Sequence, residues 1–390
     1  MARMFQQPES NVYVIAMLGF KNPIDPHFLK VADEKNGGEV KWVKTKVDLD
    51  NHVKIPMVDQ HMASPDQFVE DYIANLTNTQ ISTSIPMWDV HILNLKTCDA
   101  ESTLVIRVHH SLGDGTSLMS FLISCCRKTS EPDALPSFPA AKKSRPHTGW
   151  FWKFWSVLLL AWNTLVDIWM CVATTYFLKD TQTPLKAPSR AVAFTSRRIV
   201  RRTFCVDDVI LVKNATNTKV NDVVLAITQA GLSRYLNRKY GKGMGDGESW
   251  ENNLPNSVRL TATLFINLRS SPGIYAIAEM VKKHSQTDWG NKIGYVLYPF
   301  KIALKDNPLD YIRDAKATMD RKKATLEAQF RLFMAKVFVR FYPTKLATFP
   351  LTTMWFSNVA GPRRKLAFLA IKSPSLLHLY MVNRWRSQFI

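Results

Sequence analysis

The sequence lacks the features that mark several common protein classes. It has 5 cysteines and no Cys-x-x-Cys pair, so we expect a reducing compartment and no disulfide framework. It has no zinc-finger spacing, RNA-recognition signature or basic heptad region, which argues against nucleic-acid binding. The glycine-rich stretch 241–247 does not contain a phosphate-loop pattern and is predicted to be a flexible connection. The first residues contain no apolar run of signal-peptide length, so entry into the secretory lumen is not predicted.

The composition is that of a folded protein with an anionic partner. With 390 residues and 46% hydrophobic content, the chain can bury a large core, and two domains are expected. The net charge of +19 favours an anionic membrane face or a phosphorylated co-substrate, although a solvated basic face would explain it equally well. The 9 histidines are scattered without the spacing of a metal site, so no metal is expected.

Hydrophobic periodicity predicts mixed α/β structure in both halves. Strands are predicted at 12–20, 87–94, 104–108 and 259–267, and helices at 65–76, 116–126, 206–235 and 309–341. The helical pattern over 206–235 is interrupted at 217–219. Residues 131–146, rich in Pro, Ser and Lys, indicate a linker.

Residues 150–178 are rich in tryptophan and almost free of charge, with Lys153 and Asp167 the exceptions. The stretch is long enough to span a bilayer, which takes about 20 apolar residues. Trp favours the membrane interface, however, and a central Asp costs roughly 2.5–3.5 kcal/mol on insertion scales. We therefore favour an interfacial helix hairpin or amphipathic element over a spanning helix, with a buried helix pair as the third alternative.

The pattern His109-His110-Ser111-Leu112-Gly113-Asp114-Gly115 follows the strand predicted at 104–108 and precedes a predicted helix. Alternate residues of a strand share a face, so His110 is expected to point with the apolar residues, and His109 with Arg107. A neutral imidazole is the natural base for removing a proton from an alcohol near neutral pH. Asp114 could shape the turn or pair with an arginine, and Gly113 and Gly115 permit tight backbone geometry.

This pattern resembles the HHxxxDG motif of the CoA-dependent acyltransferase superfamily, and the chain resembles its plant wax ester synthase/diacylglycerol acyltransferase branch. Further blocks agree in order along residues 1–362. They are Ser10-Asn11-Val12-Tyr13, Pro86-Met87-Trp88-Asp89, Val220-Asn221-Asp222-Val223, Asn267-Leu268-Arg269, Gly290-Asn291, Gly294-Tyr295 and Ser357-Asn358-Val359-Ala360-Gly361-Pro362.

The resemblance implies an α/β fold like that of chloramphenicol acetyltransferase, with two lobes, each a mixed sheet with helices, and a tunnel between them. His110 would be the general base, with His109 supportive and Asp114 structural. Asn358, or a backbone N–H of its turn beside Ser357, would stabilise the oxyanion. Asn221 and Asp222 would maintain the second lobe near the tunnel.

The expected organisation is a first lobe over 1–146, an aromatic membrane-associating segment over 147–199 and a second lobe over 200–390. Between Phe28 and Gly37 the chain is shorter than the family pattern, and after Pro362 the family's continuation is not evident. We therefore expect a shortened first lobe and a truncated second lobe, with unpaired strand edges and reduced stability. This would fit an alternative or misassembled gene product.

The implied function is transfer of a fatty acyl group from acyl-CoA to a long-chain alcohol or diacylglycerol, without an acyl-enzyme or a bound cofactor. The alternatives are a non-catalytic, membrane-associated lipid-binding relative or truncated isoform, and an acyltransferase for soluble phenolic alcohols. The expected location is the cytosolic face of the endoplasmic reticulum membrane, because acyl-CoA and lipid acceptors meet at that face. The plasma membrane is the second choice.

Overall fold

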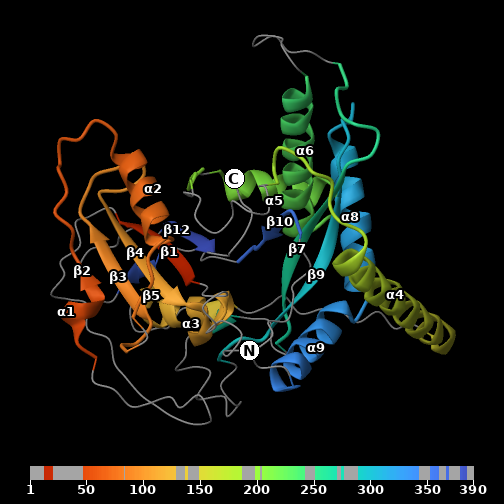
Figure 1. The fold of residues 1–390 in the computed structure, drawn as a ribbon, viewed down its shortest axis with the longest axis horizontal. Coiled ribbons are helices and arrows are strands. Elements are labelled where there is room, and N and C mark those ends of the chain that lie inside the picture. Colours follow the sequence, from red (N-terminus) through yellow and green to blue (C-terminus); the bar gives the residue numbers. More distant parts are fainter. Residues whose placement is uncertain are drawn as a thin grey trace.

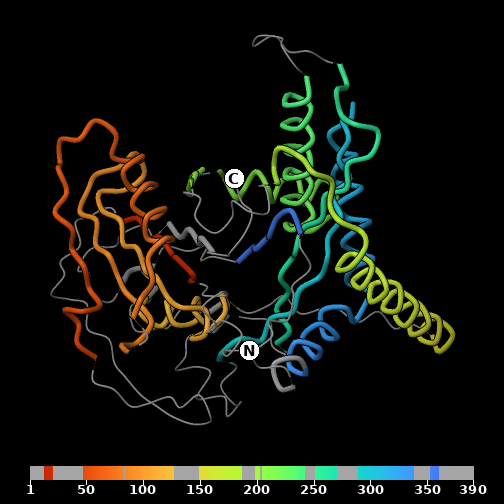
Figure 2. Tube along the Cα trace, in the orientation of Figure 1, coloured from red at the N-terminus to blue at the C-terminus, as the bar shows by residue number. Residues whose placement is uncertain are grey.

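The fold has two lobes, each built from a β-sheet and helices (Figure 1). The computed structural model describes residues 13–20, 47–82, 84–128, 137–138, 149–186, 198–202, 204–241, 251–269, 274–275, 289–341, 352–359, 366–368 and 378–383. The orange-to-yellow trace of residues 47–128 forms most of one lobe, and the green-to-blue trace of 204–341 forms most of the other (Figure 2). Three segments singled out by sequence lie outside the described residues. They are the region expected to be shortened (28–37), most of the glycine-rich stretch (242–247) and the Gly-Pro segment (360–362).

The first lobe is a five-stranded sheet in the order β12-β1-β4-β3-β2. Its strands are β1 (Tyr13–Phe20), β2 (Val53–Lys54), β3 (Trp88–Leu93), β4 (Ser102–His109) and β12 (His378–Asn383), and its helices are α1 (Leu49–His52), α2 (Pro65–Leu76) and α3 (Gly115–Ser124). The strand alternation predicts the layers, because successive side chains point to opposite faces. Ile15 and Met17 pack with the α2 residue Ile73, whereas Leu18 and Leu104 pack with the α3 residue Met119.

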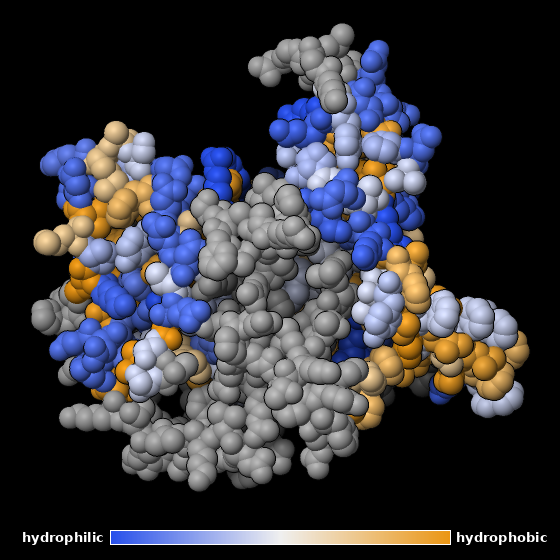
Figure 3. All heavy atoms as spheres, in the orientation of Figure 1, coloured by the Kyte–Doolittle hydropathy of each residue, from blue (hydrophilic) through white to orange (hydrophobic). Residues whose placement is uncertain are grey.

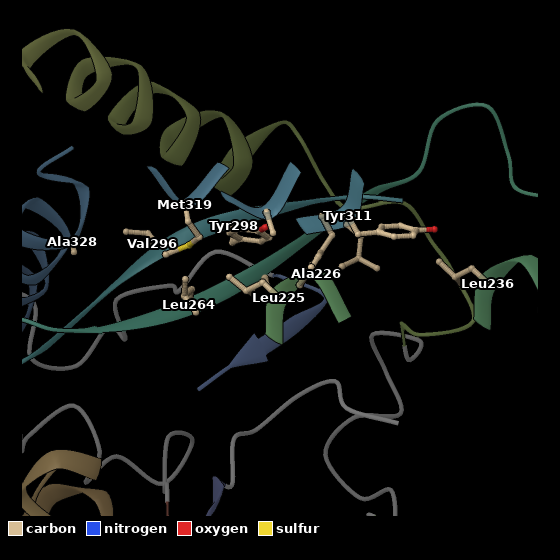
Figure 4. Packing of buried hydrophobic residues seen from close by; sticks show 13 residues of the cluster. Leu225, Ala226, Leu236, Leu264, Val296, Tyr298, Tyr311, Met319 and Ala328 are labelled. Carbon is tan, nitrogen blue, oxygen red and sulfur yellow. The ribbon is translucent and has the colours of Figure 1, made fainter. Parts of the chain in front are cut away.

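The second lobe is a three-stranded sheet in the order β10-β7-β9. Its elements are α5 (Val206–Ala215), α6 (Val220–Tyr240), β7 (Arg259–Asn267), β9 (Ile293–Lys301), α8 (Leu309–Lys323), α9 (Glu327–Phe341) and β10 (Met354–Phe356). Leu225 of α6, Leu264 of β7, Tyr298 of β9 and Met319 of α8 meet in its core (Figure 4). The helical region predicted at 309–341 forms two helices, α8 and α9, which are separated by a turn at 324–326.

Short strands join segments that are distant in the sequence. The strand β5 (Cys126–Lys128) pairs with β11 (Leu366–Phe368), and β6 (Ser137–Phe138) pairs with β8 (Ile274–Tyr275). Val359, three residues beyond the end of β10, packs against the core of the first lobe. Contacts between residues far apart in the sequence therefore connect the two halves of the chain.

The tail after residue 362 contributes strands, which differs from the expectation of unpaired edges. β12 pairs antiparallel with β1 from Val14↔Asn383 to Gly19↔His378. It belongs to the sheet of the first lobe, although it lies in the stretch assigned by sequence to the second. Pairing satisfies the backbone groups of β1 that an exposed edge would present to solvent. Because β1 is paired on this side, an unpaired edge at β1 is not a reason to expect low stability.

The aromatic stretch is one helix, α4 (Trp150–Tyr176), of 27 residues. The expected helix hairpin and the alternative of a buried helix pair were both wrong, because no Gly or Pro between these residues provides a turn. Figure 1 shows α4 projecting from the second lobe, and Figure 3 shows apolar side chains along it. Within the described residues it is the one helix whose length and composition would allow it to cross a membrane.

Candidate active site

The HHSLGDG segment forms the predicted strand, turn and helix. β4 ends at His109, residues His110–Leu112 form a short 3-10 turn, and α3 begins at Gly115. Asp114 caps α3, since its Oδ1 accepts a hydrogen bond from the Ser117 N–H at 3.0 Å. Because the extended backbone ends at His109, the strand alternation cannot be used to place the His110 side chain.

His110 is paired with Asn291, which precedes β9 in the second lobe. The two residues are 181 positions apart, and His110 Nδ1 lies 2.9 Å from Asn291 Oδ1. Asn291 Nδ2 also donates to the His110 carbonyl oxygen at 2.8 Å, which orients the amide so that its oxygen faces the ring. An amide oxygen can only accept, so the proton of the neutral imidazole lies on Nδ1 and the lone pair on Nε2.

The protonation of His110 is set mainly by its burial. The side chain is 7% exposed, and burial lowers the pKa of His110 below its usual value. A hydrogen bond with the His110 backbone, the Asp114 charge and the hydrogen bond with Asn291 all raise the pKa of His110, but they do not reverse this shift. A lowered pKa keeps the imidazole neutral at and below neutral pH, which is the form a general base requires.

His109 lies on the other side of the turn and is engaged within the first lobe. Its Nδ1 is 2.7 Å from Ser111 Oγ, and its ring meets that of Tyr13 edge-on at 5.2 Å between centroids. Its backbone N–H donates to the Met87 carbonyl oxygen at 2.9 Å. These contacts are what a supporting residue would make, and they tie the turn to β1 and to the start of β3.

Asp114 is completely buried and pairs with an arginine of the second lobe. Its Oδ2 accepts from Arg269 Nη1 at 2.8 Å and from the Lys292 N–H at 2.9 Å. The Asp114 and Arg269 side chains are each 1% exposed. With both carboxylate oxygens accepting hydrogen bonds from the loop and the second lobe, Asp114 is suited to a structural role.

The strand-flanking segment Trp289-Gly290-Asn291 packs directly on the histidine loop. Ser117 Oγ donates to the Gly290 carbonyl oxygen at 3.0 Å, and the Gly290 N–H donates back to Ser117 Oγ at 3.0 Å. Gly290 has a φ of +102°, which favours glycine. Gly113 is required for close approach, because a Cβ there would lie 2.9 Å from Ser117 Cβ. The site is therefore a junction between the two lobes.

The other predicted residues form a second cluster, at the start of α6. Asn358 Nδ2 donates to Asn221 Oδ1 at 2.6 Å, and the adjacent Ser357 is exposed. Asp222 caps α6 by accepting from the Lys219 N–H at 2.9 Å. Asn221 and Asn358 are thus brought together from opposite ends of the second lobe, and Asn221 occupies one of the two N–H donors of the Asn358 amide.

Sequence reasoning assigned no role to Arg269 and Asn291, although both stand in blocks that it singled out. It also missed a buried ion pair between neighbouring strands, in which Arg107 Nε donates to Asp89 Oδ1 at 2.9 Å and Nη2 contacts Oδ2. Burial alone would raise the pKa of Asp89, but His91 and Arg107 hold it at about 2. Charged residues inside the predicted strands 87–94 and 104–108 were the available signal.

A small apolar cavity of about 40 Å³ lies between the sheet and α3. It is lined by Val14, Ala16, Ile106, Val108, Leu118, Met119, Phe121 and Leu122. The volume suits a small apolar group and not a fatty acyl chain, so the tunnel expected between the lobes stays a prediction.

A two-lobed α/β fold with a buried histidine in an HHxxxDG loop is what the resemblance to the CoA-dependent acyltransferases implies. Comparison with known protein families gives two matches in this chain. The wax ester synthase/diacylglycerol acyltransferase catalytic domain matches residues 21–224, and the WS/DGAT C-terminal domain matches residues 289–372. The second match continues beyond Pro362, where sequence inspection saw no family continuation.

Individual relatives agree over most of the chain, which belongs to the wax ester synthase/diacylglycerol acyltransferase family. Wax ester synthase/diacylglycerol acyltransferase 5 of Arabidopsis thaliana is 41% identical over 408 residues, covering 94% of this chain and 80% of the relative. Wax ester synthase/diacylglycerol acyltransferase 11 of the same organism is 41% identical over 398 residues, covering 94% of this chain and 81% of the relative. The solved enzyme from Marinobacter aquaeolei VT8 has a TM-score of 0.53 at 17% identity, covering 95% of this chain and 81% of that one, and supports the fold.

Proposed function

We propose that this acyltransferase moves a fatty acyl group from acyl-CoA to a long-chain alcohol, forming a wax ester, or to diacylglycerol, forming triacylglycerol. The observation that carries the proposal is the pairing of His110 Nδ1 with Asn291 Oδ1, which leaves Nε2 as the basic nitrogen. A base with this tautomer and a lowered pKa can accept a proton from an alcohol at neutral pH.

The reaction proceeds by direct attack, without an acyl-enzyme. His110 Nε2 removes the proton of the acceptor hydroxyl as its oxygen attacks the thioester carbonyl carbon. The tetrahedral intermediate collapses with cleavage of the carbon–sulfur bond, and the imidazolium returns the proton to the departing CoA sulfur. Asn358, or a backbone N–H in its turn, is the proposed donor to the oxyanion; the Asn358 amide carries a second N–H besides the one that it donates to Asn221. No bound cofactor takes part.

The location that suits these substrates is the cytosolic face of the endoplasmic reticulum membrane, with the plasma membrane as the second choice. The exposed apolar surface of α4 supports membrane association. The non-catalytic alternative depended on incomplete lobes. Its main premise is weakened by the pairing of β12 with β1 and by the family match through residue 372.

The test is acyl transfer by microsomes that contain the expressed chain, given labelled palmitoyl-CoA with either hexadecanol or diacylglycerol. We expect ester product from the native chain and none from His110→Ala, and the better acceptor identifies the main reaction. His61→Ala, at an exposed histidine, is the matched control and should retain full activity. Equal product from His110→Ala and the native chain would disprove the assignment of the base.

A further inference from the structure

Helix α4 carries a polar stripe along one face. The stripe consists of Lys153, Ser156, Asn163, Thr164, Asp167 and Thr174. At 100° per residue these positions fall within a sector of roughly 100°. The other side of the helix is apolar and exposed, with exposed fractions of 64% for Phe151, 64% for Trp162 and 70% for Trp169. The long apolar helix is therefore amphipathic.

The polar stripe is bound to the second lobe over the C-terminal half of α4. Asn163 Nδ2 donates to the Ala324 carbonyl oxygen at 3.3 Å, and Thr164 Oγ1 accepts from the Leu326 N–H at 2.9 Å. Further along, Thr174 Oγ1 accepts from Arg259 Nη2 at 2.9 Å. These contacts connect α4 to the turn between α8 and α9 and to the start of β7.

Asp167 joins this half of α4 to a chain of buried charges. Its carboxylate is fully buried and accepts from Arg321 Nη2 and Lys322 Nζ, both at 2.9 Å. Lys322 also donates to Glu327 at 2.8 Å, and Glu327 pairs with Arg331 at 2.7 Å. Separating α4 from the lobe would break both ion pairs of Asp167 and leave Lys322 with Glu327 as its remaining carboxylate partner, which is unfavourable because Lys322 is buried. The docked half is therefore a fixed part of the lobe.

The part of α4 that is free of these contacts is too short to cross a bilayer. It runs from Trp150 to Trp162, about 13 residues or roughly 20 Å at 1.5 Å per residue. A hydrocarbon core of about 30 Å requires about 20 residues. The exposed tryptophans of this part, including Trp152 and Trp155, favour the interfacial region of a membrane.

We propose that α4 lies within one leaflet, parallel to the plane of the membrane, with its polar stripe toward the protein and its tryptophan face toward the lipid. This inference rests on the proposed function only for the choice of the cytosolic leaflet. Leu326 and Phe333 are 45% and 61% exposed, and Leu326 adjoins α4 through Thr164, so they extend the apolar surface. The partner is the bilayer, and both ends of α4 stay on the cytosolic side.

Vesicle flotation of the purified full chain tests the lipid partner, with phosphatidylcholine vesicles that contain a minor fraction of phosphatidylserine. Trp162→Ser/Trp169→Ser should lower partitioning roughly tenfold or more, since both side chains lose their apolar area in the lipid. The matched control is Leu211→Ser/Ile227→Ser, at positions 71% and 59% exposed on α5 and α6, and should float like the native chain. Flotation unchanged by the tryptophan substitutions would overturn the proposal. A native chain that dimerises through α4 and does not float would also overturn it.

Cysteine accessibility in sealed microsomes tests the orientation. Gly149→Cys and Phe177→Cys place a thiol at either end of α4, and the exposed native Cys205 serves as the cytosolic reference. An impermeant maleimide, read by peptide mass spectrometry, should modify both ends without permeabilisation. Modification of one end only after permeabilisation would show that α4 spans the membrane. His110→Ala should lose acyl transfer yet still float, which separates failure of this proposal from failure of the proposed function.

Discussion

The contact between His110 and Asn291 predicts opposite pH shifts for two substitutions at one position. Asn291→Ala removes the acceptor at His110 Nδ1 and the donor to the His110 carbonyl oxygen, which lie at 2.9 and 2.8 Å. Leaving such a buried polar group without its partner costs about 1–3 kcal/mol. If that cost falls on the transition state, kcat decreases by roughly 5- to 160-fold.

The sign of each pH shift follows from the groups that act on His110. Burial lowers its pKa, while the hydrogen bond with Asn291 raises it. Removing that bond in Asn291→Ala lowers the pKa further, so the acid limb of the rate profile moves to lower pH. Asn291→Asp places a negative charge beside the ring, which favours the imidazolium, so the acid limb moves to higher pH.

The assay follows release of the CoA thiol against pH, at saturating acyl-CoA and acceptor. Asn78→Ala, an exposed asparagine after α2, is the control and should leave both the rate and the profile unchanged. A role limited to folding would lower the amount of active enzyme without moving the acid limb. Shifts in the same direction for Asn291→Ala and Asn291→Asp, or no shift in either, would refute the reasoning.

Three further predictions concern stability, each measured by urea unfolding followed by circular dichroism. Asp114→Asn leaves Arg269 buried without its charge partner and should cost about 3–5 kcal/mol; a double-mutant cycle with Arg269→Met should show strong coupling, and additive effects would contradict the pairing. Gly113→Ala places a Cβ 2.9 Å from another Cβ and should cost about 1–3 kcal/mol, whereas an unchanged midpoint would show that the loop relaxes freely. The pKa of Asp89 is lowered to about 2 from its usual 3.8, so its contribution is complete above that usual value and is lost as the pH falls toward 2. Arg107→Met should lower the free energy of unfolding by about 3–5 kcal/mol near neutral pH and weaken its dependence on pH in the acid range. An unchanged dependence on pH would contradict the role given to the Asp89–Arg107 pair.

Local sequence patterns were sufficient for most elements of the two lobes. The helix predicted at 65–76 coincides with α2, and the strand predicted at 259–267 coincides with β7. The division of 206–235 into two helices was also confirmed, with Asn217 at a φ of 47° in the turn between them. These elements succeed because hydrophobic periodicity and helix-breaking residues act within a few positions of one another.

In the aromatic segment, the hairpin prediction was wrong and the cost of the central charge depended on distant residues. Its tryptophans and Asp167 suggested an interfacial hairpin or an amphipathic element, and the absence of a turn residue excludes the hairpin in favour of the single helix that forms. The central carboxylate is satisfied by Arg321 and Lys322 of α8, more than 150 positions away. Those partners could not be identified from the segment itself, so the charge looked more costly than it is.

The sequence by itself indicated the family of this protein, through an HHSLGDG turn between a strand and a helix and companion motifs in the order of the acyltransferase family. Only the tertiary structure showed that Arg269 and Asn291 of the second lobe complete that turn and that β12 returns to pair with β1. The physical reason is the sequence distance over which each interaction acts. Turn and helix preferences are set by neighbouring residues, whereas the partner of a buried charge or an unpaired strand is selected when distant segments pack together.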